Sequence, residues 1–119
     1  MSTQPPSPSP QRFKLRIRPT PGFTLVICSG RLTSDITAEF KQEIRALIPQ
    51  TKRIVLDLDA VGFIDSAGIG ALVGVYVTAK KSECELQLLN LSKKVRELLG
   101  MTHLLSVFES AGQHGTRMI

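Results

Sequence analysis

The stretch Ile54-Val55-Leu56-Asp57-Leu58 precedes Asp65-Ser66-Ala67-Gly68-Ile69-Gly70, and this order of segments indicates the fold. The first stretch has the apolar composition of a buried β-strand. The apolar segment 71–77, which follows the second stretch, predicts a buried helix. Ser66 is therefore expected where a strand passes into a helix, next to the unpaired N–H groups and the positive end of the helix dipole.

Two interpretations of Ser66 follow from this position. In the structural one, Asp65 or Ser66 is an ordinary cap whose side chain accepts a hydrogen bond from the first turn. In the functional one, Ser66 can be phosphorylated without unfolding its own domain, because a helix N-terminus accommodates an anion. The two glycines, Gly68 and Gly70, would allow close backbone approach around it. The order of the surrounding elements is needed to choose between the two.

Composition narrows the class of protein. The chain has 119 residues, of which 42% are hydrophobic and 21% charged, as in one globular domain with a modest core. No apolar run could span a bilayer and no signal pattern is present, so we expect a cytoplasmic protein without membrane insertion. The net charge of +5 comes from scattered basic residues without interleaved aromatic ones, so direct nucleic-acid binding is not expected. Cys28 and Cys84 are predicted to be buried free thiols.

The N-terminal part predicts a β-hairpin. Residues 13–18 alternate apolar and basic side chains, as a half-buried strand does. Residues 19–22 (Pro-Thr-Pro-Gly) predict a turn whose prolines end the pairing. Residues 23–28 predict the second strand, and Gly30 is expected to interrupt it.

Helices and strands are expected to alternate after the hairpin. A helix is predicted over 36–48, ended by Pro49, with three candidate N-cap residues: Thr33, Ser34 and Asp35. After the central segments described above, residues 86–89 predict a strand. Ser92 is expected to cap a short helix that stops at Gly100. Residues 104–108 could add a last contact or a short edge strand.

These elements predict an α/β fold with a single mixed β-sheet of four to five strands packed with helices. The domain is expected over residues 13–109. The Ser- and Pro-rich segment 1–12 is expected to be a disordered tail, and the polar segment 110–119 a flexible one.

The chain resembles the STAS domain family, and in particular the bacterial anti-sigma factor antagonists, over about residues 13–109. Each matching fragment is weak alone, but their order and spacing are specific. In chain order they are Gly30-Arg31-Leu32, Val55-Leu56-Asp57-Leu58, Phe63-Ile64-Asp65-Ser66-Ala67-Gly68-Ile69-Gly70 and Leu88-Leu89-Asn90-Leu91-Ser92, with Val95 and Leu98 beyond.

The resemblance implies a binding protein that works without a cofactor. Its unphosphorylated form would bind an anti-sigma factor that is also a serine kinase of the histidine-kinase-like ATPase class, and so free the sigma factor. The kinase would phosphorylate Ser66 and thereby switch binding off, and a metal-dependent serine phosphatase would reverse the modification.

The implied partner-binding residues lie on two segments. Because the carboxyl ends of parallel strands meet at one edge of a sheet, residues 31–35 are expected beside the Ser66 loop. Ile69 is expected near the exposed start of its helix, as an apolar contact. The full set is Asp65, Ala67, Gly68 and Ile69 after the third strand, and Thr33, Ser34 and Asp35 after the second.

One residue departs from the family pattern. Ala67 stands where the switch members usually carry a second hydroxyl residue. This leaves Ser66 intact but favours an alternative, in which the domain is a non-phosphorylated scaffold in a lipid-transport ATPase complex or a larger signalling assembly.

Catalysis is a third class of function that the sequence could indicate. Ser66 as a nucleophile would need His103 or His114 as its base, and neither histidine has sequence support for that role. Strand alternation and turn placement explain the nearby aspartates better than a metal site does; these are Asp57, Asp59 and Asp65. The sequence therefore predicts a protein that is not an enzyme and holds no metal.

Overall fold

The computed structural model describes residues 12–101, which form an α/β fold. The elements in chain order are β1 (Lys14–Thr20), β2 (Phe23–Leu32), α1 (Thr37–Leu47), the short 3₁₀ helix η2 (Ile48–Gln50), β3 (Arg53–Ile64), α2 (Ser66–Lys81), β4 (Glu85–Leu89) and α3 (Lys93–Met101). Of the expected tails, residues 1–11 and 110–119 lie outside the described residues, as do the contact at 104–108 and both histidines. None of the helices within 12–101 is long and apolar enough to cross a membrane.

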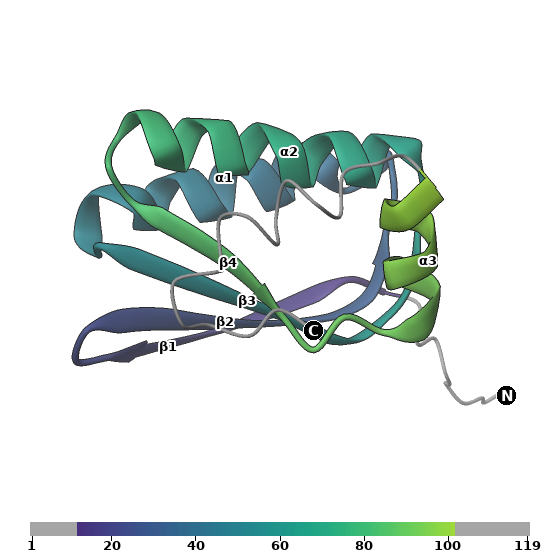
Figure 1. Ribbon diagram of the computed structural model, residues 1–119, viewed down its shortest axis with the longest axis horizontal. Helices are drawn as coiled ribbons and strands as arrows, with labels where there is room; N and C mark the ends of the chain where they lie inside the picture. Colours follow the sequence, from purple (N-terminus) through teal and green to yellow (C-terminus); the bar gives the residue numbers. More distant parts are fainter. Residues whose placement is uncertain (1–11, 102–119) are drawn as a thin grey trace, which may run out of the picture.

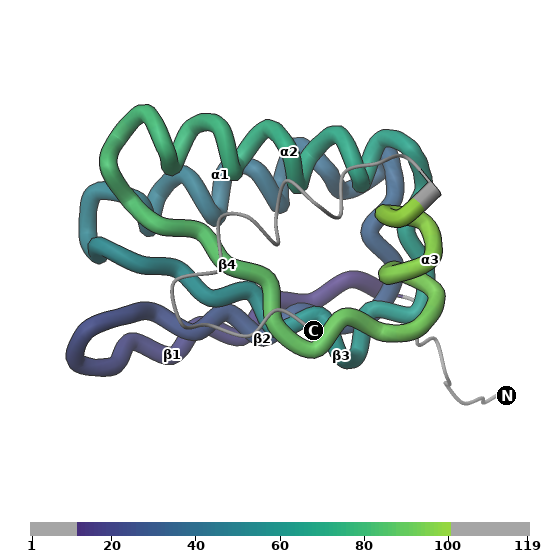
Figure 2. Tube along the Cα trace, viewed as in Figure 1, coloured from purple at the N-terminus to yellow at the C-terminus, as the bar shows by residue number. Residues whose placement is uncertain are grey.

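The four strands make one mixed sheet in the order β1-β2-β3-β4. β1 pairs antiparallel with β2, whereas β2 with β3 and β3 with β4 are parallel. α1 and α2 lie side by side on one face of the sheet, and α3 stands at the end where β3 finishes (Figures 1 and 2). The predicted mixed sheet packed with helices is therefore confirmed. Since β2 and β3 are parallel, their carboxyl ends meet at the same edge.

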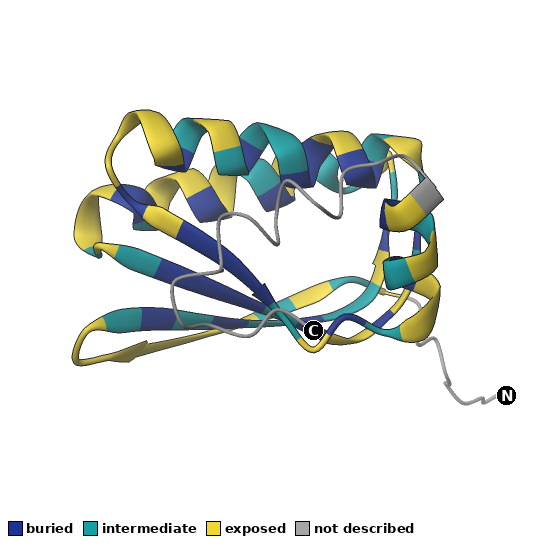
Figure 3. Cartoon of the chain, in the orientation of Figure 1, coloured by how far each residue is buried: buried dark blue, intermediate teal, exposed yellow. Residues whose placement is uncertain are grey.

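The core lies between the sheet and the two long helices. Figure 3 shows buried residues along the strands and on the sides of the helices that face them. Alternate residues of the inner strands are almost fully buried, as is the side of α1 and of α2 that faces the sheet; examples are Val26, Leu56, Leu88, Phe40 and Leu72. Burial of each such apolar side chain stabilises the folded state by about 1.5–3 kcal/mol relative to an exposed one. This packing fixes where α2 begins relative to the sheet.

Both cysteines are free and buried, as predicted. Burial raises the pKa of the Cys28 thiol to about 12, and the negative charge of Asp57 adds to this effect. Cys28 is therefore a small apolar residue of the core, and its thiol is not reactive at neutral pH.

The prediction that β2 ends at Cys28 is wrong, because the strand continues through Gly30 to Leu32. Gly30 has φ +98°, and a Cβ atom there would lie 2.3 Å from the carbonyl oxygen of Arg12. Glycine therefore allows the chain entering β1 to lie directly against β2. The pairing register with β3 shifts between Gly30 and Arg31, which re-aims the residues that follow.

Two further strand predictions need correction. Pro19 pairs with Thr24 inside the hairpin, and only the two residues after Thr20 form the turn. A proline is tolerated here because β1 is an edge strand, where the missing N–H can face away from the sheet. β3 is also one continuous strand from Arg53 to Ile64, not a short strand followed by a separate approach to the loop.

The helix boundaries differ from prediction at three points. Ile36 occupies the N-cap position of α1 without a side-chain hydrogen bond, so none of the three expected residues caps it. Instead, the Ile36 N–H donates to the Thr33 carbonyl at 2.9 Å and the Thr33 hydroxyl donates to Asp35, which makes a turn of its own. α1 ends at Leu47, and Pro49 belongs to the short η2 helix that follows. α3 runs through Gly100 to Met101.

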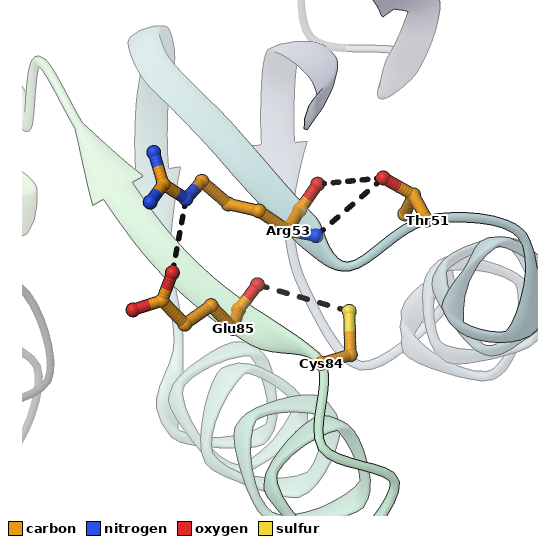
Figure 4. Close-up of polar contacts among 4 residues, drawn as sticks. All are labelled: Thr51, Arg53, Cys84 and Glu85. Atoms are coloured by element: carbon orange, nitrogen blue, oxygen red, sulfur yellow. Dashed lines mark hydrogen bonds and ion pairs between the residues drawn. The ribbon is translucent and has the colours of Figure 1, made fainter. Parts of the chain in front are cut away.

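Other contacts fix the remaining ends of the elements. Ser92 caps α3 as predicted, since the Val95 N–H donates to its Oγ at 3.3 Å. At the opposite end of the sheet, Arg53 Nε and Glu85 Oε1 form an ion pair at 2.9 Å that joins the starts of β3 and β4 (Figure 4). Both side chains are 43% exposed, so the pair adds only about 0–1 kcal/mol.

Candidate functional site

Ser66 is exposed and is the first residue of α2, directly after the end of β3. The residue before it, Asp65, occupies the N-cap position in an extended conformation. Asp65 Oδ1 accepts a hydrogen bond from the Gly68 N–H at 2.8 Å. Asp65 is therefore the cap of α2, and the Ser66 side chain stands at the surface of the first turn.

Asp65 also joins the two segments that the sequence predicted to be neighbours. Its second carboxylate oxygen, Oδ2, accepts from the Ser34 N–H at 3.0 Å. Its backbone N–H donates to the Leu32 carbonyl at 3.3 Å. The expected adjacency of the segment after β2 and the Ser66 loop is thus confirmed. One carboxylate holds both segments, although Arg31 and Leu32 themselves still belong to β2.

Gly68 lets the first turn of α2 lie directly against the end of β2. A Cβ atom at this position would lie 2.2 Å from the Leu32 carbonyl oxygen and 2.7 Å from Ile64 Cγ1. Gly70 differs, because it is exposed and no atom lies within 4 Å of the place where its Cβ would be. Of the two glycines expected to shape the turn, only Gly68 is required by close packing.

The prediction that Ile69 is exposed is wrong. Ile69 is only 8% exposed and belongs to the hydrophobic core. The first turn of α2 points this side chain towards the sheet, since the helix packs on the core along most of its circumference. Ala67 is half-buried and Gly68 is buried. Only part of the expected partner-binding set is therefore at the surface.

The electrostatics of the site centre on Asp65. Its pKa lies below the ordinary value, first because the carboxylate accepts the Gly68 N–H, and also because it accepts the Ser34 N–H. Asp65 is consequently ionised at neutral pH. The exposed Ser66 hydroxyl thus stands next to a fixed negative charge that already satisfies donors of the helix N-terminus.

Sequence reasoning missed a contact that links two of the matching fragments. The guanidinium carbon of Arg31 lies 4.6 Å from the centre of the Phe63 ring, a cation–π contact between β2 and β3. The register pairs the same two residues. Such a contact contributes about 0.5–1 kcal/mol at exposed sites. Its only signal in the sequence is that Arg31 and Phe63 each stand two residues before a segment of the site.

The nearby aspartates have separate roles. Asp57 Oδ1 accepts from the Asp59 N–H at 3.0 Å and from the Asn90 side-chain amide at 3.5 Å. Asp65 is committed to α2 and to Ser34. Within residues 12–101, no group of three or more His, Cys, Asp and Glu side chains could hold a metal ion.

Asp65→Ala is expected to lower the free energy of unfolding by about 2 kcal/mol at neutral pH, since it removes a helix cap and a second hydrogen bond. Asp59→Ala removes the same charge from an exposed residue that, within residues 12–101, forms its hydrogen bond to Asp57 through its backbone N–H, so it should change stability by less than about 0.5 kcal/mol. Urea denaturation measures both variants. Equal effects would show that the Asp65 carboxylate does not hold the site together.

The same pair of variants predicts a pH dependence. Because folding lowers the pKa of Asp65, its contribution is present above the unfolded pKa and is lost as the pH falls through the folded value. The stability difference between wild type and Asp65→Ala should therefore shrink on acidification. If the stability difference between wild type and Asp65→Ala stays constant down to the pH of acid unfolding, the ionised Asp65 carboxylate is not what stabilises the site.

Comparisons with known proteins agree with this fold and site. The STAS domain model matches residues 14–116, and the chain therefore belongs to the STAS domain family. BtrV of Bordetella bronchiseptica, which is named as a candidate anti-sigma factor antagonist, is 28% identical over 100 residues, covering 83% of this chain and 86% of that protein.

Three solved structures share the fold. An anti-sigma factor antagonist from Mycobacterium paratuberculosis superposes with a TM-score of 0.74 at 23% identity, over 84% of this chain and 86% of that one. The anti-sigma factor antagonist SpoIIAA, in its unphosphorylated form, gives 0.65 at 23% identity, over 78% and 82%. The phosphorylated form of SpoIIAA from Bacillus gives 0.62 at 22% identity, over 80% and 86%. The resemblance to anti-sigma factor antagonists expected from the sequence is confirmed.

Proposed function

We propose that this protein is an anti-sigma factor antagonist of the cytoplasm, which binds an anti-sigma factor and so frees a sigma factor. The observation that carries the proposal is the exposed Ser66 at the N-terminus of α2, placed by Asp65 beside the segment that follows β2. The name of the relative BtrV and the shared fold with two anti-sigma factor antagonists support it.

Phosphorylation of Ser66 is the proposed switch. The unphosphorylated form binds an anti-sigma factor that is also a serine kinase of the histidine-kinase-like ATPase class, and a metal-dependent serine phosphatase restores this form. A phosphate adds about −1.5 to −2 charges. Next to the ionised Asp65, that charge accumulates at one point of the surface. SpoIIAA, which shares the fold, has been solved both with and without its phosphate.

The proposed interface spans the two joined segments. Ser34, Asp35 and Ser66 are exposed there, while Thr33, Asp65 and Ala67 are half-buried. Gly68 and Ile69 are buried, so their part is to fix the first turn of α2. A partner that covers both segments would have to remove water from Ser66, which makes binding sensitive to any charge added there.

The alternative function remains a non-phosphorylated scaffold subunit of a lipid-transport ATPase complex or a larger signalling assembly. Ala67 is the observation that favours it, because the second hydroxyl of the switch members is absent. Both functions are binding functions, and we propose no catalytic role for Ser66. They differ in whether Ser66 is modified.

Incubation with ATP and each serine kinase of this ATPase class from the same genome should add one phosphate, detected by intact-mass analysis. Ser66→Ala should abolish the gain in mass. Ser34→Ala is the matched control, because it removes a neighbouring exposed hydroxyl but keeps the backbone N–H that Asp65 accepts. Modification of Ser66→Ala to the wild-type extent would contradict the assignment, and no modification by any of these kinases would favour the scaffold.

A further inference from the structure

The outer edge of β1 has backbone groups that point away from the sheet. β1 is an edge strand, and no strand lies beyond it within residues 12–101 (Figure 1). Thr20 and Phe23 flank a two-residue turn and form the hydrogen-bonded pair next to it. Along an antiparallel ladder, hydrogen-bonded pairs alternate with pairs that form no hydrogen bonds to each other. Leu15 and Ile17 belong to the second kind, so their N–H and C=O groups point away from β2. Pro19 belongs to the same set, which suits a residue without an N–H.

A groove lined by four apolar side chains and two glutamates runs beside this edge on the face that carries the helices. It has a volume of about 230 Å³ and lies between β1 and α1, lined by Phe13, Leu15, Ile17, Glu39, Phe40 and Glu43. The Phe13 and Phe40 rings meet edge to face, with centres 5.9 Å apart. Ile17 is 38% exposed, an unusual value for a large apolar side chain of a strand. Alternate side chains of an added strand would enter this groove, and apolar ones would fit it.

The opposite face of β1 has a row of cations: Lys14, Arg16 and Arg18 are all exposed. The one ion pair within residues 12–101 joins β3 to β4, so none of these three side chains is paired in that part of the chain. Their cross-strand neighbours on β2 carry no charge either, being Ser29, Ile27 and Leu25. Acidic side chains on an added strand would stand directly opposite these cations.

Charge excludes two other occupants of this edge. A second copy that pairs through its own β1 would place rows of lysine and arginine opposite each other, and like charges directly opposite are destabilising. Residues 1–11 of the chain contain no charged side chain, and residues 102–119 contain a single acidic one, so neither complements the cations. The complementary ligand is an extended segment of another protein.

We propose that the β1 edge is a second docking surface, which binds by strand addition a partner segment that alternates acidic with apolar side chains. The backbone groups of Leu15 and Ile17 supply the hydrogen bonds. The groove and the row of cations on β1 then select the side chains on the two faces of the added strand. This surface does not include Ser66, but it adjoins the Ser66 site, because Phe13 and Lys14 line one pocket together with Asp35.

The test uses a synthetic octapeptide that alternates glutamate with valine, titrated into the ¹⁵N-labelled full-length protein. The expected result is a set of amide shifts concentrated at Leu15, Ile17 and Phe40. Two control peptides should not shift these amides. The first has lysine in place of each glutamate, and the second has the same composition but with all glutamates before all valines. Shifts elsewhere, an absence of shifts, or equal binding of the lysine peptide would overturn the proposal.

Two double variants test whether the cations of β1 select the acidic side chains of the peptide. Arg16→Gln with Arg18→Gln should weaken binding of the glutamate–valine peptide at least about tenfold. Lys93→Gln with Lys94→Gln removes the same charge from exposed positions on α3 and should leave the affinity unchanged. If the β1 double variant fails to fold, the wild-type affinity at high salt replaces it, since screening should weaken binding. Ser66→Asp should bind the peptide as wild type does, which separates this proposal from the phosphorylation switch.

Discussion

Gly68→Ala is expected to lower the free energy of unfolding by about 2–3 kcal/mol, because forced overpacking of a buried position costs that much. The new Cβ atom would lie 2.2 Å from the Leu32 carbonyl oxygen, a contact that cannot persist. That oxygen cannot move easily, because it belongs to the backbone at the end of β2 and accepts the Asp65 N–H. The gain in helix propensity, about 0.5–1 kcal/mol, does not offset the clash. Urea denaturation measures the loss.

Gly70→Ala in the same helix is the matched control, and the opposite sign is expected. Gly70 is exposed, and its Cβ would meet no atom within 4 Å. The substitution should therefore stabilise the protein by up to about 1 kcal/mol through helix propensity alone. Stabilisation by both substitutions would mean that α2 does not lie against the end of β2 as described.

The strands show what could be predicted from a pattern and what could not. Alternation of apolar and polar residues predicted the hairpin, and the compact apolar run predicted the central strand. The same local reasoning predicts strand ends at Gly30 and Pro19, because glycine and proline interrupt many strands. Their tolerance here depends on what lies beside them: the backbone of Arg12 lies against Gly30, and no further strand pairs with the outer edge of β1 within residues 12–101. Neither neighbour is visible in a local pattern.

In the candidate site, too, some features could be predicted from the sequence and others could not. The order of segments predicted Ser66 at a helix start and residues 33–35 beside it, because parallel strands bring their carboxyl ends together. The sequence could not assign the cap, since Asp65 and Ser66 are both good capping residues. It also could not orient α2, whose residues are apolar nearly all round. Ile69 is therefore buried, while Val77, with a similar side chain on the same helix, is 43% exposed.

The interaction between Asp65 and Ser34 was beyond sequence reasoning for another reason. The donor is the backbone N–H of Ser34, so the identity of that side chain carries no information about the bond. The structure thus changes the interpretation of residues 33–35, from candidate caps of α1 to a turn held by the cap of α2. It also explains why Asp65 has two functions in the site, one for each carboxylate oxygen.

Ser66→Asp is expected to weaken binding to the proposed partner, an anti-sigma factor that is also a kinase, by more than about a hundredfold, which corresponds to about 3 kcal/mol. Asp65 is already ionised at this point of the surface, and a partner covering Ser66 would have to desolvate a second carboxylate beside it. Isothermal titration of the kinase with each variant measures the effect. Ser66→Asn, similar in size but uncharged, should bind far more tightly than Ser66→Asp.

The fold itself should tolerate the same substitution. A carboxylate in the first turn of α2 interacts favourably with the helix dipole, and Ser66 is exposed, so stability should change by no more than about 0.5 kcal/mol. The melting temperature of Ser66→Asp should then stay within a few degrees of wild type. Weak binding with an intact fold is the behaviour of a switch, because added charge acts on the partner and not on the domain. If Ser66→Asp unfolds the protein together with the loss of binding, Ser66 is a structural residue and the switch is refuted.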